Sequence, residues 1–87
     1  MLSPQTLIQL IQGHLTDAQV QVQDLTGGGD HWQAVIVSSS FAGKSRVQRH
    51  QLVYQALQSL LQTNELHALT MQTFTPEEWN QTPQQIR

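Results

Sequence analysis

The stretch GGGDHWQAVIVS, residues 27–38, decides the fold of this 87-residue chain. Its glycine run is typical of a turn, and the apolar run that follows predicts a β-strand from Trp32 to Ser38. Before the turn, Val20 and Val22 alternate with glutamines, which predicts a half-buried strand. Because the connection is short, we expect the two strands to pair as an antiparallel hairpin.

N-terminal to the hairpin, the sequence predicts a helix. Ser3 followed by Pro4 is typical of an N-cap and the first helical residue. Apolar residues then recur at the spacing of one helix face, at Leu7, Ile8, Ile11 and Leu15. We expect this helix to end at Gly13 or within residues 15–17.

C-terminal to the hairpin, a serine-rich loop over residues 38–44 precedes a second, longer helix. Phe41 is the expected apolar anchor of the loop. Ser45 is the expected N-cap of the helix, which we expect to continue to about Thr63. The apolar stripe of that helix consists of Val47, Val53, Ala56, Leu57, Leu60 and Leu61. This face is large enough to cover the sheet.

The last part of the chain predicts a third strand and a short helix. Alternation from Leu66 to Phe74 indicates the strand, and Thr75-Pro76-Glu77-Glu78 matches a capping box with proline at the first helical position. Trp79 is the expected anchor of that helix. The order α-β-β-α-β-α predicts an α+β fold, with helices packed on a three-stranded sheet. We expect a single domain over residues 1–80 and a flexible polar tail over residues 81–87.

Charge narrows the choice of partners. The chain has 4 lysines and arginines against 6 acidic residues, a formal net charge of −2, which argues against electrostatic binding of nucleic acid over the whole surface. Three of the basic residues nevertheless lie close together, at Lys44, Arg46 and Arg49. This cluster fits an acidic partner or a short stretch of phosphate, or it is simply the solvated start of a helix.

No cysteine occurs in the chain, which excludes disulfides, thiolate metal sites and thiol nucleophiles within it. No apolar run approaches the roughly 20 residues of a membrane span, and the N-terminus shows no signal-peptide pattern, so we expect a cytoplasmic protein. Glu77 and Glu78 are explained by helix capping, and the glycine run precedes a strand rather than the helix that a phosphate-binding loop requires. We expect that the protein is not an enzyme.

Two histidines are candidate metal ligands. His31 and His67 each lie where a loop enters a predicted strand, so they share one site if the two strands start side by side. A solvated or capping role is the alternative for each of them. His14 ends the first helix, where it can face the helix carbonyls, and His50 lies on the long helix, where a structural hydrogen bond is the usual role. The spacing of these residues gives no closed four-ligand zinc site.

Four blocks of the sequence resemble the BolA family in register. They are Ser38-x-x-Phe41-x-Gly43-Lys44-Ser45, Val47-Gln48-Arg49-His50-Gln51-Leu52-Val53-Tyr54-x-Ala56-Leu57, Leu66-His67-Ala68-Leu69 and Thr75-Pro76-Glu77-Glu78-Trp79. The resemblance covers nearly the whole chain. It implies an α-β-β-α-α-β-α fold similar to the type II KH domain, with a short helical turn before the long helix.

The resemblance also implies a function. BolA-like proteins partner monothiol glutaredoxins of the CGFS type, with which they hold a [2Fe–2S] cluster in iron–sulfur trafficking and iron regulation, without catalysis. His67 matches the C-terminal histidine that serves as a ligand in cluster-binding members. The second ligand comes from the hairpin loop, where this chain resembles the subgroup with histidine in place of cysteine, and His31 takes that role. The remaining ligands would be thiolates from the glutaredoxin and its bound glutathione, so the implied assembly is a heterodimer.

Some members of the family are described as nucleic-acid-binding transcriptional regulators, which is the alternative function. The contacts would be Lys44, Arg46, Arg49 and His50. The chain lacks the Gly-x-x-Gly clamp of KH domains and has Gln51 where the family's helix is often basic, and both differences weaken this alternative. An interaction module without metal is a third interpretation. The sequence leaves open whether the free protein is a monomer or a homodimer.

Overall fold

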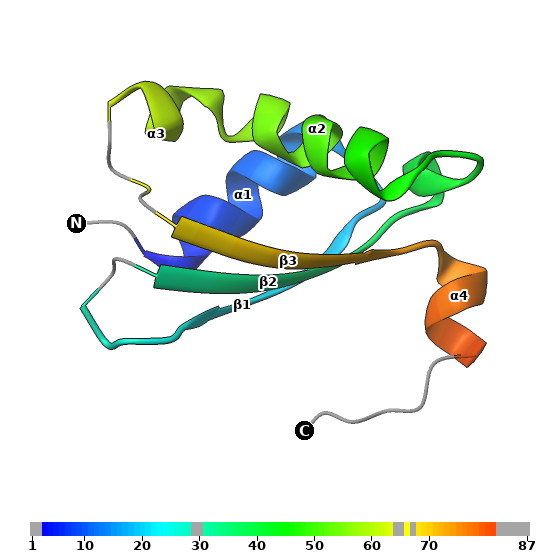
Figure 1. Ribbon diagram of the computed structural model, residues 1–87, viewed down its shortest axis with the longest axis horizontal. Helices are drawn as coiled ribbons and strands as arrows, with labels where there is room; N and C mark the ends of the chain where they lie inside the picture. The colour runs from blue at the N-terminus through cyan, green and yellow to red at the C-terminus, as the bar shows by residue number, and fades with distance from the viewer. Residues whose placement is uncertain (1–2, 29–30, 64–65, 67, 82–87) are drawn as a thin grey trace.

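The chain folds into helices and strands in the order α-β-β-α-α-β-α, as the resemblance to the BolA family implies (Figure 1). The computed structural model describes residues 3–28, 31–63, 66 and 68–81. Its elements are α1 (Pro4–His14), β1 (Gln19–Asp24), β2 (His31–Val37), the 3₁₀ helix η1 (Ser39–Phe41), α2 (Arg46–Ala56), α3 (Gln58–Gln62), β3 (Ala68–Phe74) and α4 (Pro76–Gln81). The short turn η1 lies before α2, where the resemblance places one.

The three strands form one sheet in the order β1-β2-β3. β1 and β2 are antiparallel, with Gln19 opposite Val37 and Asp24 opposite Trp32, which confirms the predicted hairpin. β3 lies parallel to β2 on its other side, because the chain passes through α2 and α3 before it enters the sheet again. β2 is therefore the central strand, and β1 and β3 are the edges of the sheet.

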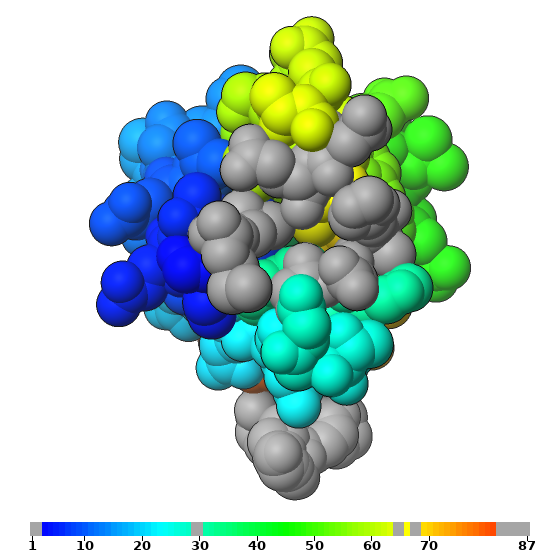
Figure 2. All heavy atoms as spheres, turned by 90° about the vertical axis from the view of Figure 1, so that its left-hand side faces the viewer, coloured from blue at the N-terminus to red at the C-terminus, as the bar shows by residue number. Residues whose placement is uncertain are grey.

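Helices α1, α2 and α3 lie on one side of the sheet (Figures 1 and 2). The core between these layers includes Leu7 and Ile11 of α1, Val53 of α2, Leu60 of α3, Met71 of β3, and Trp32, Ala34 and Ile36 of β2. Gln33 and Val35, which alternate with the buried residues of β2, are only half-buried because they point to the opposite face of the sheet. Trp79 of α4 lies beside Val35 at one end of that opposite face.

Local capping signals set the starts of the helices, as predicted. Ser3 accepts a hydrogen bond from the Thr6 N–H at 3.2 Å at the start of α1. At the start of α2, the Gln48 N–H donates to the Ser45 hydroxyl at 3.2 Å, and the Ser45 N–H donates to the Gln48 amide oxygen at 2.9 Å. These reciprocal bonds form a capping box, which satisfies two main-chain groups that the helix itself leaves unpaired.

The long helix differs from its prediction. It breaks at Leu57, whose ψ of 14° departs from the helical value, so that α2 ends at Ala56 and α3 follows as a separate helix. Two residues of the predicted apolar stripe are exposed, Val47 by 65% and Leu61 by 37%. Both are turned by about 100° or more from the buried residues of their helices, because successive helical residues are about 100° apart.

Other expectations are met closely. Phe41 is fully buried and anchors the loop before α2. The ring of Trp79 lies 5.2 Å from the ring of Phe74, centre to centre, which anchors α4 against the end of β3. α4 ends at Gln81, and residues 82–87 lie outside the described chain, so the predicted domain boundary and flexible tail stay predictions. Among the described helices, none combines the length and the apolar character needed to cross a bilayer.

Candidate functional site

His31 is the first residue of β2, and its side chain is exposed. It lies opposite Ala68, the first residue of β3, because the two strands run parallel and start at the same end of the sheet. Figure 2 shows this end of the molecule. The two strands therefore start side by side, which is the condition under which the sequence allows one shared site. His67, the second predicted ligand, lies outside the described residues, and its role stays a prediction.

The turn that leads into His31 is organised by Asp24. One oxygen of its carboxylate accepts hydrogen bonds from the main-chain N–H groups of Thr26, at 3.2 Å, and Gly27, at 3.0 Å. Gly27 has a φ of 79°, a left-handed conformation that glycine adopts without strain. The Leu25 N–H donates to the carbonyl oxygen of His31 at 2.8 Å, which closes the hairpin around the first residue of β2.

The available donor atoms fit a shared metal site rather than a complete one. The chain contains no cysteine, and the described residues contain no group of three or more histidine, cysteine, aspartate or glutamate side chains able to hold a metal ion. The exposed imidazole of His31 can supply one nitrogen ligand. The described residues alone therefore do not complete a metal site at this end of the sheet.

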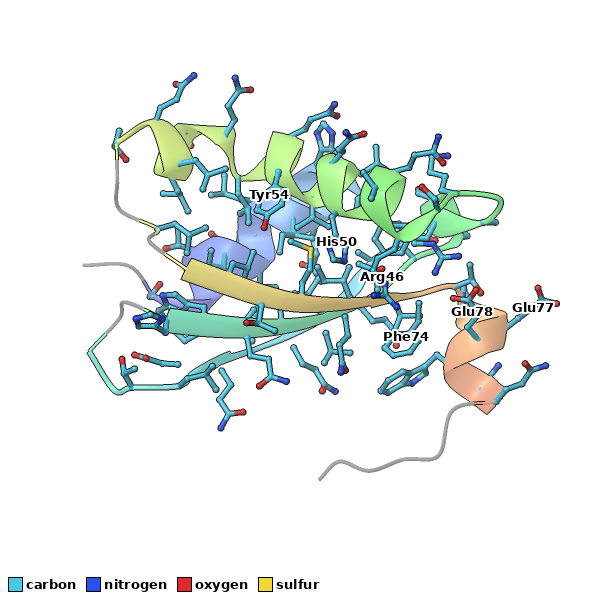
Figure 3. All side chains as sticks on the ribbon, in the orientation of Figure 1. Arg46, His50, Tyr54, Phe74, Glu77 and Glu78 are labelled. Atoms are coloured by element: carbon cyan, nitrogen blue, oxygen red, sulfur yellow. The ribbon has the colours of Figure 1, made fainter. Side chains whose placement is uncertain are left out.

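A second site lies at the other end of β3. A groove of about 600 Å³ runs between α2 and β3, lined by Lys44, Arg46, Arg49, His50 and residues 70–74. All four residues that the sequence predicts as nucleic-acid or partner contacts therefore share one groove. Figure 3 shows Arg46, His50 and Tyr54 projecting from α2 toward β3.

Arg49 differs from the other basic residues of the groove because it is bound within the protein. Its two terminal nitrogens donate to the two carboxylate oxygens of Glu78, at 2.7 and 3.1 Å, and its side chain is only 13% exposed. Its Nε donates to the carbonyl oxygen of Lys44 at 3.0 Å, and its guanidinium lies 5.9 Å from the centre of the Phe41 ring. Arg49 is thus a structural residue that joins α2 to α4, and its prediction as a surface contact is not supported.

Hydrogen bonding between Arg49 and Glu78 shifts the pKa of both residues. The hydrogen bond from Arg49, followed by that from the Thr75 N–H, lowers the pKa of Glu78 from 4.5 to about 2. The same partner raises the pKa of Arg49. The sequence shows only the capping box of Thr75 and Glu78, and it gives no sign that Glu78 also binds a residue of α2.

The groove remains cationic without Arg49. Lys44 and Arg46 are exposed, and neither has an ion-pair partner within the described part of the chain. Burial, followed by the positive charge of Arg46, lowers the pKa of His50 below its usual value of 6.5, which favours a neutral imidazole there. The described residues that line the groove include no aspartate or glutamate.

A second carboxylate with a low pKa was not evident from the sequence. Asp17 accepts hydrogen bonds from the Ser38 hydroxyl at 2.6 Å and from the Ser39 N–H at 2.8 Å, and also from the Ser39 hydroxyl. The serine hydrogen bonds lower the pKa of Asp17 to about 2. They tie the connection between α1 and β1 to the end of β2, so Asp17 has a structural role.

These features define a class: a small α+β domain with an exposed histidine where two parallel strands begin and a cationic groove beside the edge strand. Residues 4–78 match the family model described as BolA-like protein. The chain therefore belongs to the BolA-like family, as its sequence blocks indicate.

Known proteins support this assignment. The chain is 37% identical to the acid stress protein IbaG of Escherichia coli over 70 residues, which cover 79% of this chain and 83% of that protein. It is 47% identical over 53 residues to the DNA-binding transcriptional regulator BolA of Haemophilus influenzae, covering 61% of this chain and 50% of that protein. The crystal structure of a Bol-like protein from Babesia bovis has a TM-score of 0.81 and 32% identity, with 93% of each chain covered. Neither of the two named relatives carries the name of an enzyme.

Proposed function

We propose that this protein is a non-enzymatic partner of a monothiol glutaredoxin of the CGFS type, and that the two proteins share a [2Fe–2S] cluster. His31 and His67 are the ligands from this chain. One observation carries the proposal: the exposed His31 lies directly opposite Ala68, the residue that follows His67 in the sequence. Membership of the BolA-like family supports the same assignment.

Covalent geometry limits how far apart the two histidines can be. Neighbouring strands lie about 4.8 Å apart, which applies to the paired residues His31 and Ala68. Consecutive Cα atoms lie about 3.8 Å apart, which applies to residues 67 and 68. His31 therefore lies next to the residue that is bonded to residue 67, which supports a role for both imidazoles at one cluster.

The amino-acid composition of this chain determines which cluster ligands it can supply and which must come from the glutaredoxin and glutathione. A [2Fe–2S] cluster takes four protein or thiol ligands, and this chain offers nitrogen but no thiolate. Thiolates from the glutaredoxin and from glutathione complete the set. When bound, such a mixed-ligand cluster has a higher reduction potential than an all-thiolate cluster. His31 and His67 must each be neutral at the ligating nitrogen, so acid conditions weaken this chain's hold on the cluster.

The decisive experiment reconstitutes the cluster on this protein mixed with a monothiol glutaredoxin and glutathione. Visible absorption and circular dichroism are recorded for the wild type, His31→Ala, His67→Ala and the control His14→Ala, whose histidine ends α1. We expect a mixed complex with a spectrum unlike that of the glutaredoxin alone, which both ligand variants lose and the control keeps. The proposal is wrong if no mixed complex forms, or if both ligand variants retain the wild-type spectrum.

The alternative function, regulation through nucleic-acid binding, has weaker support from the geometry. The groove offers two exposed cations, Lys44 and Arg46, since Arg49 is bound to Glu78. Two phosphate contacts predict a salt dependence with a slope of only about −1.8 on duplex DNA. Because the relative from Haemophilus influenzae is named as DNA-binding, the salt dependence of duplex DNA binding should be measured for this protein. A steeper slope, lost in Arg46→Gln, would favour the alternative.

A further inference from the structure

We propose that the groove between α2 and β3 binds an acidic, extended segment of a partner protein, which adds as a fourth strand to the free edge of β3. Its carboxylates lie beside Lys44 and Arg46. This interaction goes beyond the proposed cluster site and does not depend on it, because the groove is lined by residues 70–74 rather than by the start of β3.

The first argument is the unpaired edge of β3. The Ser38 N–H donates to the carbonyl oxygen of Phe74 at 3.0 Å, so the main-chain groups of Phe74 point toward β2. Main-chain polar groups alternate in direction along a strand, and those of Met71 and Thr73 therefore point away from β2. The hydrogen bond from Arg49 to the carbonyl oxygen of Thr73, at 3.4 Å, reaches β3 from this outer side.

Arg49 leaves most of this edge available. No hydrogen bond joins the outward main-chain groups of Met71 to another described residue. An unpaired strand edge is a template for an extended peptide, which it binds through main-chain hydrogen bonds. The groove places open space directly beside this edge, so an added strand can reach it.

The second argument is charge. Lys44 and Arg46 line the groove as exposed cations without ion-pair partners among the described residues, and no described acidic side chain faces them there. The chain as a whole carries a net charge of −2, so this positive surface is a local feature. An acidic segment complements it, whereas a basic one is repelled.

The third argument is the row of side chains that α2 presents toward β3, of which Arg46 and His50 line the groove. Arg46, His50 and Tyr54 are four residues apart, so they form one row along the helix, and all three project toward β3 (Figure 3). The row changes from the guanidinium of Arg46 to the phenol ring of Tyr54, which is 39% exposed and lies beyond the residues that line the groove. An extended peptide that combines carboxylate and apolar side chains matches this row better than a uniformly charged phosphate backbone.

The test uses nuclear magnetic resonance on the isotopically labelled full chain. The probe is the capped peptide Val-Glu-Val-Glu-Val-Glu, and the matched peptide has glutamine in place of glutamate. We expect the acidic peptide to shift the amide signals of Met71 and Thr73 and to slow their hydrogen exchange. The amides of β1, at the opposite edge of the sheet, serve as internal controls, and the glutamine peptide should bind more weakly.

Two double variants distinguish the loss of positive charge in the groove from a general loss of folding. Lys44→Gln combined with Arg46→Gln should weaken binding of the acidic peptide roughly fivefold or more, since it removes two ion pairs. The control combines Gln21→Glu with Gln23→Glu, exposed residues of β1, and changes the net charge by the same amount at a distance from the groove. We expect the control to bind as the wild type does, and far-UV circular dichroism to show that both variants fold.

Three outcomes would overturn the proposal. In the first, the peptide leaves the Met71 and Thr73 amides unchanged, or the groove variant binds as tightly as the control. In the second, single-stranded oligothymidylate perturbs the groove while the peptide does not, which would assign the groove to nucleic acid. In the third, these amides shift with protein concentration alone, which would mean that a second copy of the chain occupies the edge. The assay contains no iron, so its failure is distinct from failure of the cluster proposal.

Discussion

The guanidinium of Arg49 holds both carboxylate oxygens of Glu78, at 2.7 and 3.1 Å, and thereby joins α2 to α4. Glu78 also accepts the Thr75 N–H at 3.0 Å, so one carboxylate caps α4 and binds α2 at the same time. This arrangement fixes the position of Arg49 beside the groove, and the carboxylate of Glu78 balances its positive charge. The cationic character of the groove therefore depends on Lys44 and Arg46 alone.

Replacing Arg49 should destabilise the protein. Arg49→Ala removes the two-point ion pair, the contact with Phe41 and the hydrogen bonds to the carbonyl oxygens of Lys44 and Thr73. We expect the free energy of unfolding to fall by about 1–2 kcal/mol, because Glu78 is partly exposed and water compensates for part of the loss. Urea denaturation measures the change.

Arg46→Ala is the control for this measurement. Arg46 lies one turn earlier on the same helix, is exposed and has no ion-pair partner among the described residues. Its removal should change the free energy of unfolding by less than about 0.5 kcal/mol. Equal effects of the two substitutions would contradict the structural role of Arg49.

Local sequence signals predicted most of the fold because the groups that define them are close in the chain. Ser45 and Gln48 are three residues apart, as are Thr75 and Glu78, and each pair forms a capping box. The break at Leu57 was missed, since no glycine or proline marks it. It arises where α2 and α3 each turn their own apolar residues toward the core.

The features that the sequence did not show are contacts between residues that lie far apart in the chain. Arg49 and Glu78 are 29 residues apart, and no periodic pattern links them. The basic cluster was found because its members are near one another in the chain, but the sequence could not show which cation is bound internally. His31 was predicted as a candidate ligand because it lies at a boundary between loop and strand. Its position opposite Ala68 follows from the parallel pairing of β2 and β3, which required the structure.

The anchor of the loop before α2 offers a second prediction. Phe41 is fully buried, and the Lys44 N–H donates to its carbonyl oxygen at 3.1 Å. Phe41→Ala should lower the free energy of unfolding by about 3–5 kcal/mol, because it leaves a cavity in the core and removes the ring beneath Arg49. Val47→Ala is the matched control, since Val47 is 65% exposed. A loss below about 1 kcal/mol for Phe41→Ala in urea denaturation would mean that the loop is not anchored there.

A third prediction concerns the link between the α1–β1 connection and the end of β2. Asp17→Asn removes the negative charge that accepts hydrogen bonds from Ser38 and Ser39. We expect a decrease of roughly 1 kcal/mol in the free energy of unfolding, a modest value because Asp17 is exposed to solvent. Hydrogen exchange should quicken at the Ser39 amide, which donates to Asp17 in the wild type. Unchanged exchange at that amide would show that the carboxylate does not hold the loop.

The pKa of Glu78 yields a fourth prediction, about stability in acid. Its folded-state value of about 2 lies below its ordinary value of 4.5, so the folded protein binds this proton less readily than the unfolded chain. The ionised carboxylate therefore contributes its full stabilisation above pH 4.5, and the contribution is lost as the pH falls from about 4.5 to about 2.

Glu78→Gln should flatten the decline of the melting temperature across this range of pH, because the glutamine does not titrate. Glu77→Gln is the matched control, since Glu77 is the adjacent residue, carries the same charge and points away from Arg46 of α2 (Figure 3). Asp17, whose pKa is also about 2, adds to the decline and remains in both variants. Thermal unfolding followed by circular dichroism between pH 5 and pH 2 provides the comparison. If Glu78→Gln keeps the wild-type slope while Glu77→Gln loses it, the ion pair with Arg49 is not what stabilises the protein in acid.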